Sequence, residues 1–341
     1  MRNALAISIC LAMVLCGCTS SRKPSGPTKP ATTIAVIPKA TAHEFWQSVH
    51  AGAVKAKLEL NKAGENIEII WLGPDNESER EKQISMVNNM RNKGVAGIVL
   101  APLDKMALRR PVADATAMGI PVVIIDSGLE GSDYISFVAT DNKQGGRLGG
   151  KHLVELLGGK GKVVLLRYQE NSASTENREA GFLEVMAAHK DKGIVVASSE
   201  TYGGATNASA QEASATLLRR FTDSDGKLTI DGIFTPNAST TIGMLMALRT
   251  QGFAGKVKFV GFDSTEQLTD ALRKGQIDGL VLQNPMNMGY LGVKAVVRHL
   301  KKENVEPRID TGVVLVTKEN IDKPELRDVV NPDFDKWLKQ D

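Results

Sequence analysis

Short apolar runs rich in β-branched residues alternate along the chain with amphipathic stretches, such as residues 77–94 and 209–221. Runs of this kind predict β-strands, and apolar strands that alternate with helices are typical of parallel sheets covered on both faces. We expect ten strands, at residues 32–38, 66–73, 95–102, 121–127, 134–140, 161–168, 193–202, 231–237, 257–263 and 278–284.

Ten strands are more than a single open sheet usually contains, so the pattern favours an α/β fold of two Rossmann-like lobes with about five strands each. Several strands end in a polar residue, and open parallel sheets bind ligands outside the carboxyl ends of their strands. Each of these residues taken alone also suits a helix N-cap. Polar ends from both lobes together favour one shared site, at Asp126, Thr140 with Asp141, Asn237, Asp263 and Gln283.

The first 17 residues predict a cleaved signal peptide, because Arg2 precedes an apolar run at 4–15 that is too short to span a bilayer permanently. The run ends in LCGC, and its Cys18 has the spacing of a bacterial lipobox, in which cleavage precedes a lipidated cysteine. Ordinary secretion with cleavage nearby is the alternative. The Ser-, Thr-, Pro- and Lys-rich stretch 18–32 predicts a flexible tether. We therefore expect an exported protein, anchored by lipid to a membrane, in the periplasm or at the cell surface.

The composition excludes several kinds of chemistry. All three cysteines lie within the first 18 residues, so cleavage before Cys18 leaves no intrachain disulfide, thiol nucleophile or cysteine zinc site. Arg2 is the only charged residue of the signal segment, so the 42 basic residues of the whole chain become 41 against 39 acidic ones. That near balance argues against a nucleic-acid partner, which demands a basic face.

Two motifs suggest chemistry that their details exclude. His43 and Glu44 begin like a zinc-protease helix, but Gln47 stands where the second histidine belongs, and no third ligand is evident. The GGRLGG stretch at 145–150 has Arg147 at the second glycine of a dinucleotide fingerprint and lies within a predicted helix. No nucleophile, base and orienting group can be assembled, so we expect no catalysis, no metal and no cofactor.

Phe45 and Trp46 lie where the first helix should begin, at the carboxyl end of the first strand. Two aromatics there can simply pack the helix against the core. Aromatic residues make up only 5% of this chain, however, so an adjacent pair at a predicted crevice is informative. An aromatic ring suits the C–H face of a sugar, and carboxylates, amides and guanidinium groups suit its hydroxyls. The predicted site therefore indicates a sugar or a sugar-like polyol as ligand.

Eight motifs occur along the body in the order AHEFWQSVHAGA, GIVLAP, GIPVVIIDS, FVATDNKQGG, STENREAGF, GIFTPNAS, VKFVGFDS and GLVLQNPMNMGYLGV. With them, the chain resembles the periplasmic sugar-binding proteins of the ribose-binding type, from about Thr33 to about Thr317. The resemblance implies the type I periplasmic binding fold, with a hinge of three crossings near 139–141, 282–285 and 310–313. The first lobe would then comprise 33–139 plus 284–312, and the second lobe 140–283 plus 313–338.

The resemblance also implies which residues contact the ligand. The first loop of the family supplies an amide followed by two aromatics, and His43 replaces the amide here. Ribose binders have an arginine after the acid of the fourth strand, whereas this chain has Ser127, which argues against ribose itself and makes room for a larger or differently substituted polyol. Tyr202 lies near a further aromatic of the family, in a stretch where this sequence and the family pattern do not match residue by residue. The contacts that match directly are Phe45, Trp46, Asp126, Arg178, Asn237, Asp263 and Gln283.

The resemblance implies capture and delivery of a solute. A ligand docks on one lobe, hinge bending brings the other lobe over it, and the permease and ATPase subunits of an ABC importer act on the closed form. We expect a monomer. A receptor that presents the closed form to a sensor kinase or chemoreceptor is the alternative, and an exported enzyme is a weaker one. A regulator of the lactose-repressor type would need a helix-turn-helix where this chain has a signal peptide.

Overall fold

The computed structural model describes residues 30–340, and its α/β architecture confirms the predicted fold class. All ten predicted strands are present, and with two further strands they form two six-stranded sheets. The predicted signal peptide and most of the tether lie outside the described residues. None of the helices in residues 30–340 is both long enough and apolar enough to cross a membrane.

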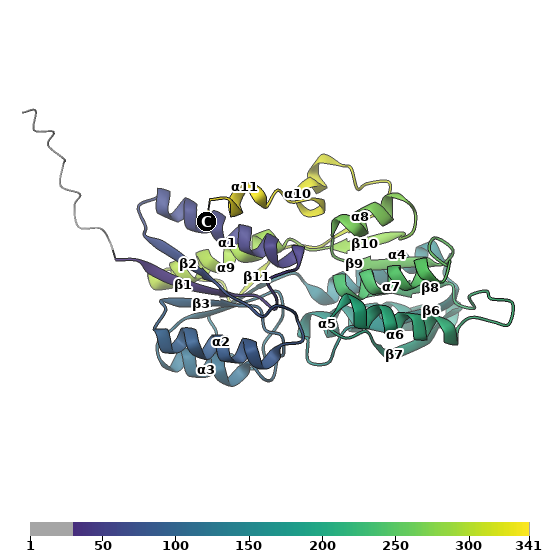
Figure 1. The fold of residues 1–341 in the computed structure, drawn as a ribbon, viewed down its shortest axis with the longest axis horizontal. Helices are drawn as coiled ribbons and strands as arrows, with labels where there is room; N and C mark the ends of the chain where they lie inside the picture. The colour runs from purple at the N-terminus through teal and green to yellow at the C-terminus, as the bar shows by residue number, and fades with distance from the viewer. Residues whose placement is uncertain (1–29, 341) are drawn as a thin grey trace, which may run out of the picture. The chain divides into compact units, whose positions relative to one another are not determined.

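The first sheet has the order β11-β5-β4-β3-β1-β2, and every neighbouring pair is parallel. Helices α1 and α9 pack on one face and α2 and α3 on the other (Figure 1). Side chains of β1 alternate between the faces, so Val36 joins the core under α1 and α9, whereas Ile37 joins the core under α2 and α3. The strands are β1 (Thr32–Ile37), β2 (Ile67–Trp71), β3 (Gly97–Leu100), β4 (Val122–Ile125), β5 (Ser136–Ala139) and β11 (Arg308–Asp310), and the helices are α1 (Glu44–Lys62), α2 (Arg80–Lys93), α3 (Arg109–Ala117) and α9 (Pro285–Leu300).

The second sheet has the order β12-β10-β9-β8-β6-β7, and only the β12–β10 pair is antiparallel among its described strands. Helices α4 and α5 cover one face, and α6, α7 and α8 cover the other. The strands are β6 (Gly161–Arg167), β7 (Ile194–Tyr202), β8 (Gly232–Phe234), β9 (Lys258–Phe262), β10 (Gly279–Leu282) and β12 (Val314–Val316), and the helices are α4 (Asn142–Leu156), α5 (Ala173–Ala188), the short 3₁₀ helix η1 (Lys190–Lys192), α6 (Asn207–Arg220), α7 (Ala238–Thr250) and α8 (Glu266–Arg273).

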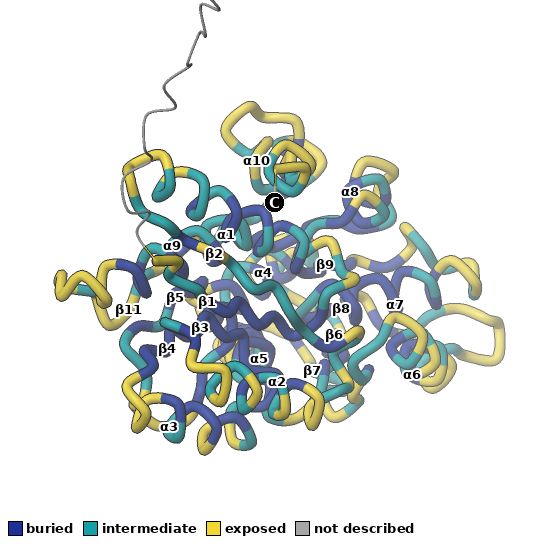
Figure 2. Tube along the Cα trace, turned by 60° about the vertical axis from the view of Figure 1, so that its left-hand side comes forward, coloured by how far each residue is buried: buried dark blue, intermediate teal, exposed yellow. Residues whose placement is uncertain are grey.

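The chain passes between the two sheets three times. It leaves the first sheet after β5, returns after β10, and places β11 in the first sheet and β12 in the second. Arg308 donates hydrogen bonds to the carbonyl oxygens of Ala139 (2.6 Å) and Thr140 (3.0 Å), and the Thr140 hydroxyl donates to the carbonyl oxygen of Gly312 (3.0 Å). The first and third crossings are therefore held together. Buried strands fill the interior of the fold and exposed turns surround them (Figure 2).

The C-terminal segment forms η2 (Pro324–Leu326), α10 (Arg327–Val330) and α11 (Asp335–Leu338). Ile321 and Val330 are buried in the core of the second lobe. Helix α11 belongs to the range expected in the second lobe, yet it packs against α1 of the first lobe, where Lys55 Nζ lies 5.6 Å from the ring centroid of Trp337. The segment thus contacts both lobes.

Candidate functional site

A cavity of about 280 Å³ lies at the carboxyl ends of strands from both sheets. Loops after β1, β2 and β4 of the first sheet and after β6, β8, β9 and β10 of the second contribute to its wall. This is the edge where open parallel sheets bind ligands. The structure brings together eight of the ten residues predicted to contact a ligand, because the cavity is lined by His43, Phe45, Trp46, Asp126, Arg178, Asn237, Asp263 and Gln283.

The aromatic pair begins helix α1 and also lines the cavity. His43 is the N-cap of α1, and its Nδ1 accepts a hydrogen bond from the backbone N–H of Phe45 (3.1 Å). The rings of Phe45 and Trp46 meet edge to face with their centroids 4.8 Å apart. Asn237 caps α7 in the same way, accepting from the backbone N–H of Thr240. His43 and Asn237 therefore have both of the roles considered from the sequence: each caps a helix, and each also lines the cavity.

Two buried carboxylates of the wall, Asp126 and Asp263, stand on strained backbone. Their φ angles are 60° and 68°, in the left-handed region that residues other than glycine rarely adopt. Such a conformation costs on the order of 1–3 kcal/mol and is concentrated at ligand sites. In this backbone conformation, both side chains line the cavity directly after β4 and β9.

Arg178, near the start of α5, lies between these two carboxylates. Its Nη2 is 4.0 Å from Asp126 Oδ1, and its Nη1 is 4.0 Å from Asp263 Oδ2. Burial lowers the pKa of the Arg178 guanidinium, and the negative charges of Asp263 and Asp126 oppose that change. Because an arginine starts from a very high pKa, the side chain stays charged.

The guanidinium of Arg178 is fixed but not fully paired. Its Nε donates to Asn142 Oδ1 (2.8 Å), its Nη1 donates to the carbonyl oxygen of Pro236 (2.9 Å), and its central carbon lies 4.1 Å from the ring centroid of Phe262. Its Nη2 is buried and has no hydrogen-bond partner within residues 30–340. A buried donor without a partner is rare and costly, so this atom is available to a ligand.

Gln283 supplies a matching acceptor at the hinge. Its Nε2 donates to Asp263 Oδ1 (2.7 Å), whereas its Oε1 is buried without a hydrogen-bond partner in the described part of the chain. Burial raises the pKa of Asp263, while Arg178 and the hydrogen bond from Gln283 oppose that rise. The wall therefore offers one unpaired donor and one unpaired acceptor, which suits a hydroxyl group, since a hydroxyl both donates and accepts.

Lys39, Glu77 and Tyr168 are among the wall residues that were not predicted from the sequence. Lys39 Nζ lies 3.1 Å from Asp126 Oδ2 and 3.3 Å from Ser174 Oγ. The Tyr168 hydroxyl donates a hydrogen bond to Glu77. Lys39 follows β1 and Tyr168 follows β6, so the rule that found the polar strand ends would have found both if it had been applied to every strand.

Two predicted contacts do not line the cavity, Ser127 and Tyr202. Ser127 is fully buried, and its Oγ accepts a hydrogen bond from the backbone N–H of Ser174 (3.1 Å), so it supports the wall from behind. Tyr202 is 42% exposed at the end of the edge strand β7, with its ring 5.7 Å from the guanidinium carbon of Arg167. The register between β6 and β7 is irregular, and an apolar pattern carries no signal for such a shift.

The two lobes contact each other around the cavity. Lys105 of the first lobe forms an ion pair with Glu176 of the second, and its backbone N–H donates to the carbonyl oxygen of Asn171 (3.0 Å). On another side, the backbone N–H of Glu266 donates to Glu44 Oε2 (3.4 Å). The loops of both lobes thus enclose the site.

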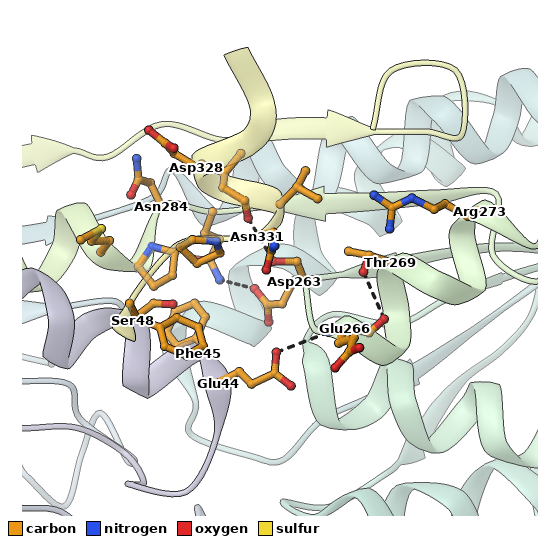
Figure 3. Close-up of a pocket in the computed structure, with 18 residues that line it drawn as sticks. Glu44, Phe45, Ser48, Asp263, Glu266, Thr269, Arg273, Asn284, Asp328 and Asn331 are labelled. Carbon is orange, nitrogen blue, oxygen red and sulfur yellow. Dashed lines mark hydrogen bonds between the residues drawn. The ribbon is translucent and has the colours of Figure 1, made fainter. Parts of the chain in front are cut away.

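A second cavity, of about 570 Å³, shares Phe45, Asp263 and Gln283 with the first (Figure 3). Figure 3 shows Glu44 reaching toward Glu266 at the start of α8, and Asn331 of the C-terminal segment lines the same cavity. The three shared residues form a common wall of the two cavities.

Other predicted features concern residues or groups that the site does not contain. Cys18, the predicted lipidation site, lies outside residues 30–340. Within that range, no three His, Cys, Asp or Glu side chains are grouped so that they could hold a metal ion. The GGRLGG stretch lies inside α4, as expected.

Comparison with known proteins agrees with this geometry. Residues 34–304 match the periplasmic binding protein domain. The ribose import binding protein of Salmonella typhimurium is 27% identical over 287 residues, which cover 84% of this chain and 91% of that protein. Among solved structures, an Agrobacterium vitis ABC transporter solute-binding protein with bound D-fucose is 37% identical, with a TM-score of 0.79, over 87% of this chain and 99% of that chain. An Agrobacterium radiobacter carbohydrate transporter solute-binding protein in complex with D-arabinose is 33% identical, with a TM-score of 0.81, over 88% of this chain and 99% of that chain. The chain belongs to the periplasmic binding protein family and has its type I fold of two α/β lobes.

Proposed function

We propose that this protein is an extracytoplasmic solute-binding lipoprotein that captures a sugar or a sugar-like polyol between its lobes and delivers it to an ABC importer. The observation that carries the proposal is the pair of unsatisfied buried atoms in the cavity wall, Arg178 Nη2 and Gln283 Oε1. They lie in a wall that also contains the rings of Phe45, Trp46 and Tyr168 and the buried carboxylates of Asp126 and Asp263.

These groups suit a polyhydroxylated guest for a physical reason. A ring hydroxyl can accept from Arg178 and donate to Gln283 or a carboxylate, while the aromatic rings cover the C–H face. A ligand that lacks such a hydroxyl leaves the protein atoms unpaired, at a cost of about 1–3 kcal/mol for each. Selectivity then arises from binding alone, without chemistry.

The size of the site favours a small guest. A cavity of about 280 Å³ is at the small end of protein ligand pockets, which suits a monosaccharide or a short polyol. The relatives that carry D-fucose and D-arabinose support this class. Ser127, which stands where ribose binders of the family have arginine, argues for a ligand other than ribose.

The family supports the transport role, and the sequence of the first 32 residues supports the location. Hinge closure over the ligand presents a shape that a permease recognises. A lipidated Cys18 followed by a tether would hold the body near that permease while leaving the lobes free to close.

Calorimetry of the purified protein against pentoses, hexoses and polyols tests the ligand class. We expect at least one of them to bind with micromolar affinity, which needs only about 8 kcal/mol. Binding of a nucleoside or an amino acid with no carbohydrate binding would contradict the proposal while leaving the fold unaffected.

Arg178→Lys tests the site, because lysine keeps the charge and loses the forked pair of donors. We expect affinity for the sugar found in the screen to fall roughly 10- to 100-fold. Arg147→Lys is the matched control, since Arg147 does not line the cavity and pairs with Glu184. Equal sugar affinity in the two variants would show that Arg178 does not contact the ligand.

A further inference from the structure

Glu77 joins the aromatic pair of one lobe to a tyrosine of the other. Its Oε1 accepts a hydrogen bond from the indole N–H of Trp46 (2.8 Å), and its Oε2 accepts one from the hydroxyl of Tyr168. All three side chains line the ligand cavity. Both of these donors are neutral. Burial is the main cause, and the charge of Glu77 the second cause, that raises the pKa of Tyr168 well above its ordinary value. The phenol therefore remains a hydrogen-bond donor.

Two of these residues belong to the first lobe and one to the second. Trp46 lies in the first turn of α1, and Glu77 lies in the loop after β2. This loop is held to the loop after β1 by a hydrogen bond from the backbone N–H of Thr41 to the carbonyl oxygen of Pro74 (3.0 Å). Tyr168 follows β6 of the second sheet. The Trp46–Glu77 bond is therefore local to one lobe, whereas the Tyr168–Glu77 bond exists only when the lobes meet.

We propose that Glu77 is a positioning residue that couples closure of the lobes to the orientation of the Trp46 ring. When the lobes are apart, Oε2 loses its donor, and the half-buried carboxylate is free to rotate between the indole and water. When the lobes close, the Tyr168 hydroxyl fixes one oxygen and thereby the other, so the indole is held in one orientation. The ligand then meets an aromatic surface that is fixed only in the closed form, which lowers the entropic cost of the last binding step.

This inference rests on the proposed ligand cavity but not on the identity of the ligand, because closure can be imposed without one. Gly128 follows β4 in the first lobe, and Ala173 begins α5 in the second. A Cβ atom at residue 128 would lie 3.6 Å from the Cβ of Ala173, within the span of about 3.5–4.5 Å found in disulfides. Gly128→Cys with Ala173→Cys therefore gives a covalent bond that closes the lobes on oxidation and releases them on reduction.

The experiment uses the body from residue 30 onward, since Ala31–Asp341 form a compact unit of their own and all three native cysteines precede it. Trp71→Phe and Trp337→Phe leave Trp46 as the only tryptophan. Time-resolved anisotropy of Trp46 is measured in the oxidised and reduced double-cysteine protein. We expect the population of mobile ring orientations to fall roughly fivefold on oxidation, the change that one hydrogen bond produces.

Variants separate this coupling from general tightening of the closed form. Tyr168→Phe and Glu77→Ala should abolish the response to oxidation, whereas Glu77→Gln should keep most of it, because an amide can still accept from the indole and donate to the phenol oxygen. Tyr290→Phe is the matched control, since its hydroxyl bonds to Glu59 on α1, away from the cavity. Equal restriction of Trp46 in Tyr168→Phe and in the parent protein, or no change on oxidation in any of them, would overturn the proposal. Neither outcome bears on whether a sugar binds, which the calorimetric screen decides separately.

Discussion

At the scale of single residues, the site is built from buried charges that are paired with one another but not saturated. Lys39, Asp126, Arg178 and Asp263 are each at most 6% exposed. Burying such groups is costly unless charge partners and hydrogen bonds compensate. Their mutual contacts supply part of that compensation, and Arg178 Nη2 is left without a hydrogen-bond partner within residues 30–340. Buried polar atoms without partners thus destabilise the ligand-free protein, and the same atoms can select a ligand that pairs with them.

Glu179, beside Arg178 on α5, should make stability depend on pH. Its carboxylate accepts from the backbone N–H of Tyr168 (3.2 Å) and from Arg167 Nη1 (2.9 Å), yet burial raises its pKa from 4.5 to about 7. Between these two values the folded protein retains a proton that the unfolded chain has released. The resulting stability is present below pH 4.5 and is lost as the pH rises toward about 7.

Urea unfolding of the parent protein and of Glu179→Gln from pH 5 to pH 8 measures this contribution. We expect the free energy of unfolding of the parent to fall, relative to the variant, by on the order of 1–3 kcal/mol over that range. Glu184→Gln, an exposed change on the same helix, is the control and should give a profile parallel to the parent. Parallel profiles for the parent and Glu179→Gln would contradict the raised pKa.

Several of the cavity residues predicted from the sequence share one property, namely that a simple positional rule marks them, whereas Arg178 came only from the family resemblance. Asp126, Asp263 and Gln283 each follow an apolar strand, and Phe45 begins a helix after one. Glu77 could not be found in this way, because it lies six residues beyond β2 and enters the cavity through the course of its loop. Tyr202 does not line the cavity, and it lies on β7 beyond the register shifts between β6 and β7.

At the scale of elements, the glycine-rich α4 positions Arg178, although none of the residues of α4 lines the cavity. Glycines of α4 and α5 let the two helix backbones approach closely: a Cβ at Gly146 would lie 1.9 Å from the carbonyl oxygen of Arg178, and one at Gly181 would lie 2.1 Å from that of Lys143. The GGRLGG stretch therefore serves helix packing. Ten strands were predicted from apolar runs, and β8 is among them although it has only three residues, whereas β11 and β12, also of three residues each, were not predicted.

Gly146→Ala tests this packing. The added methyl group cannot fit without moving α5, so we expect a loss of about 1–3 kcal/mol in stability together with weaker sugar binding, because Arg178 moves with its backbone. Thermal unfolding and calorimetry measure the two effects. Gly128→Ala serves as the control, since its new methyl group would meet nothing closer than 3.6 Å. A stable Gly146→Ala protein with unchanged affinity would show that the helices can separate at no cost to the site.

At the scale of the whole body, the C-terminal segment spans the two lobes beside the hinge. Val330 is buried in the second lobe and the Ser264 hydroxyl donates to the carbonyl oxygen of Val329 (3.0 Å), whereas Trp337 lies beside Lys55 of α1 in the first lobe. Opening of the lobes would move α1 away from α8, and a segment anchored at both ends opposes that movement. Residues 305–340 lie beyond the matched family domain, so nothing in the family motifs predicted this contact.

Trp337→Ala should therefore shift the ligand-free body toward the open form. The cation–π contact with Lys55 is worth about 0.5–1 kcal/mol, which changes the ratio of open to closed molecules roughly two- to fivefold. Small-angle X-ray scattering should detect a larger radius of gyration, and sugar affinity should weaken by a similar factor because less of the ligand-free protein is in the closed form. Lys339→Ala, on an exposed side chain of the same segment, is the control and should change neither quantity. If Trp337→Ala leaves the scattering unchanged while lowering only the melting temperature, α11 stabilises the first lobe alone and has no part in the motion of the hinge.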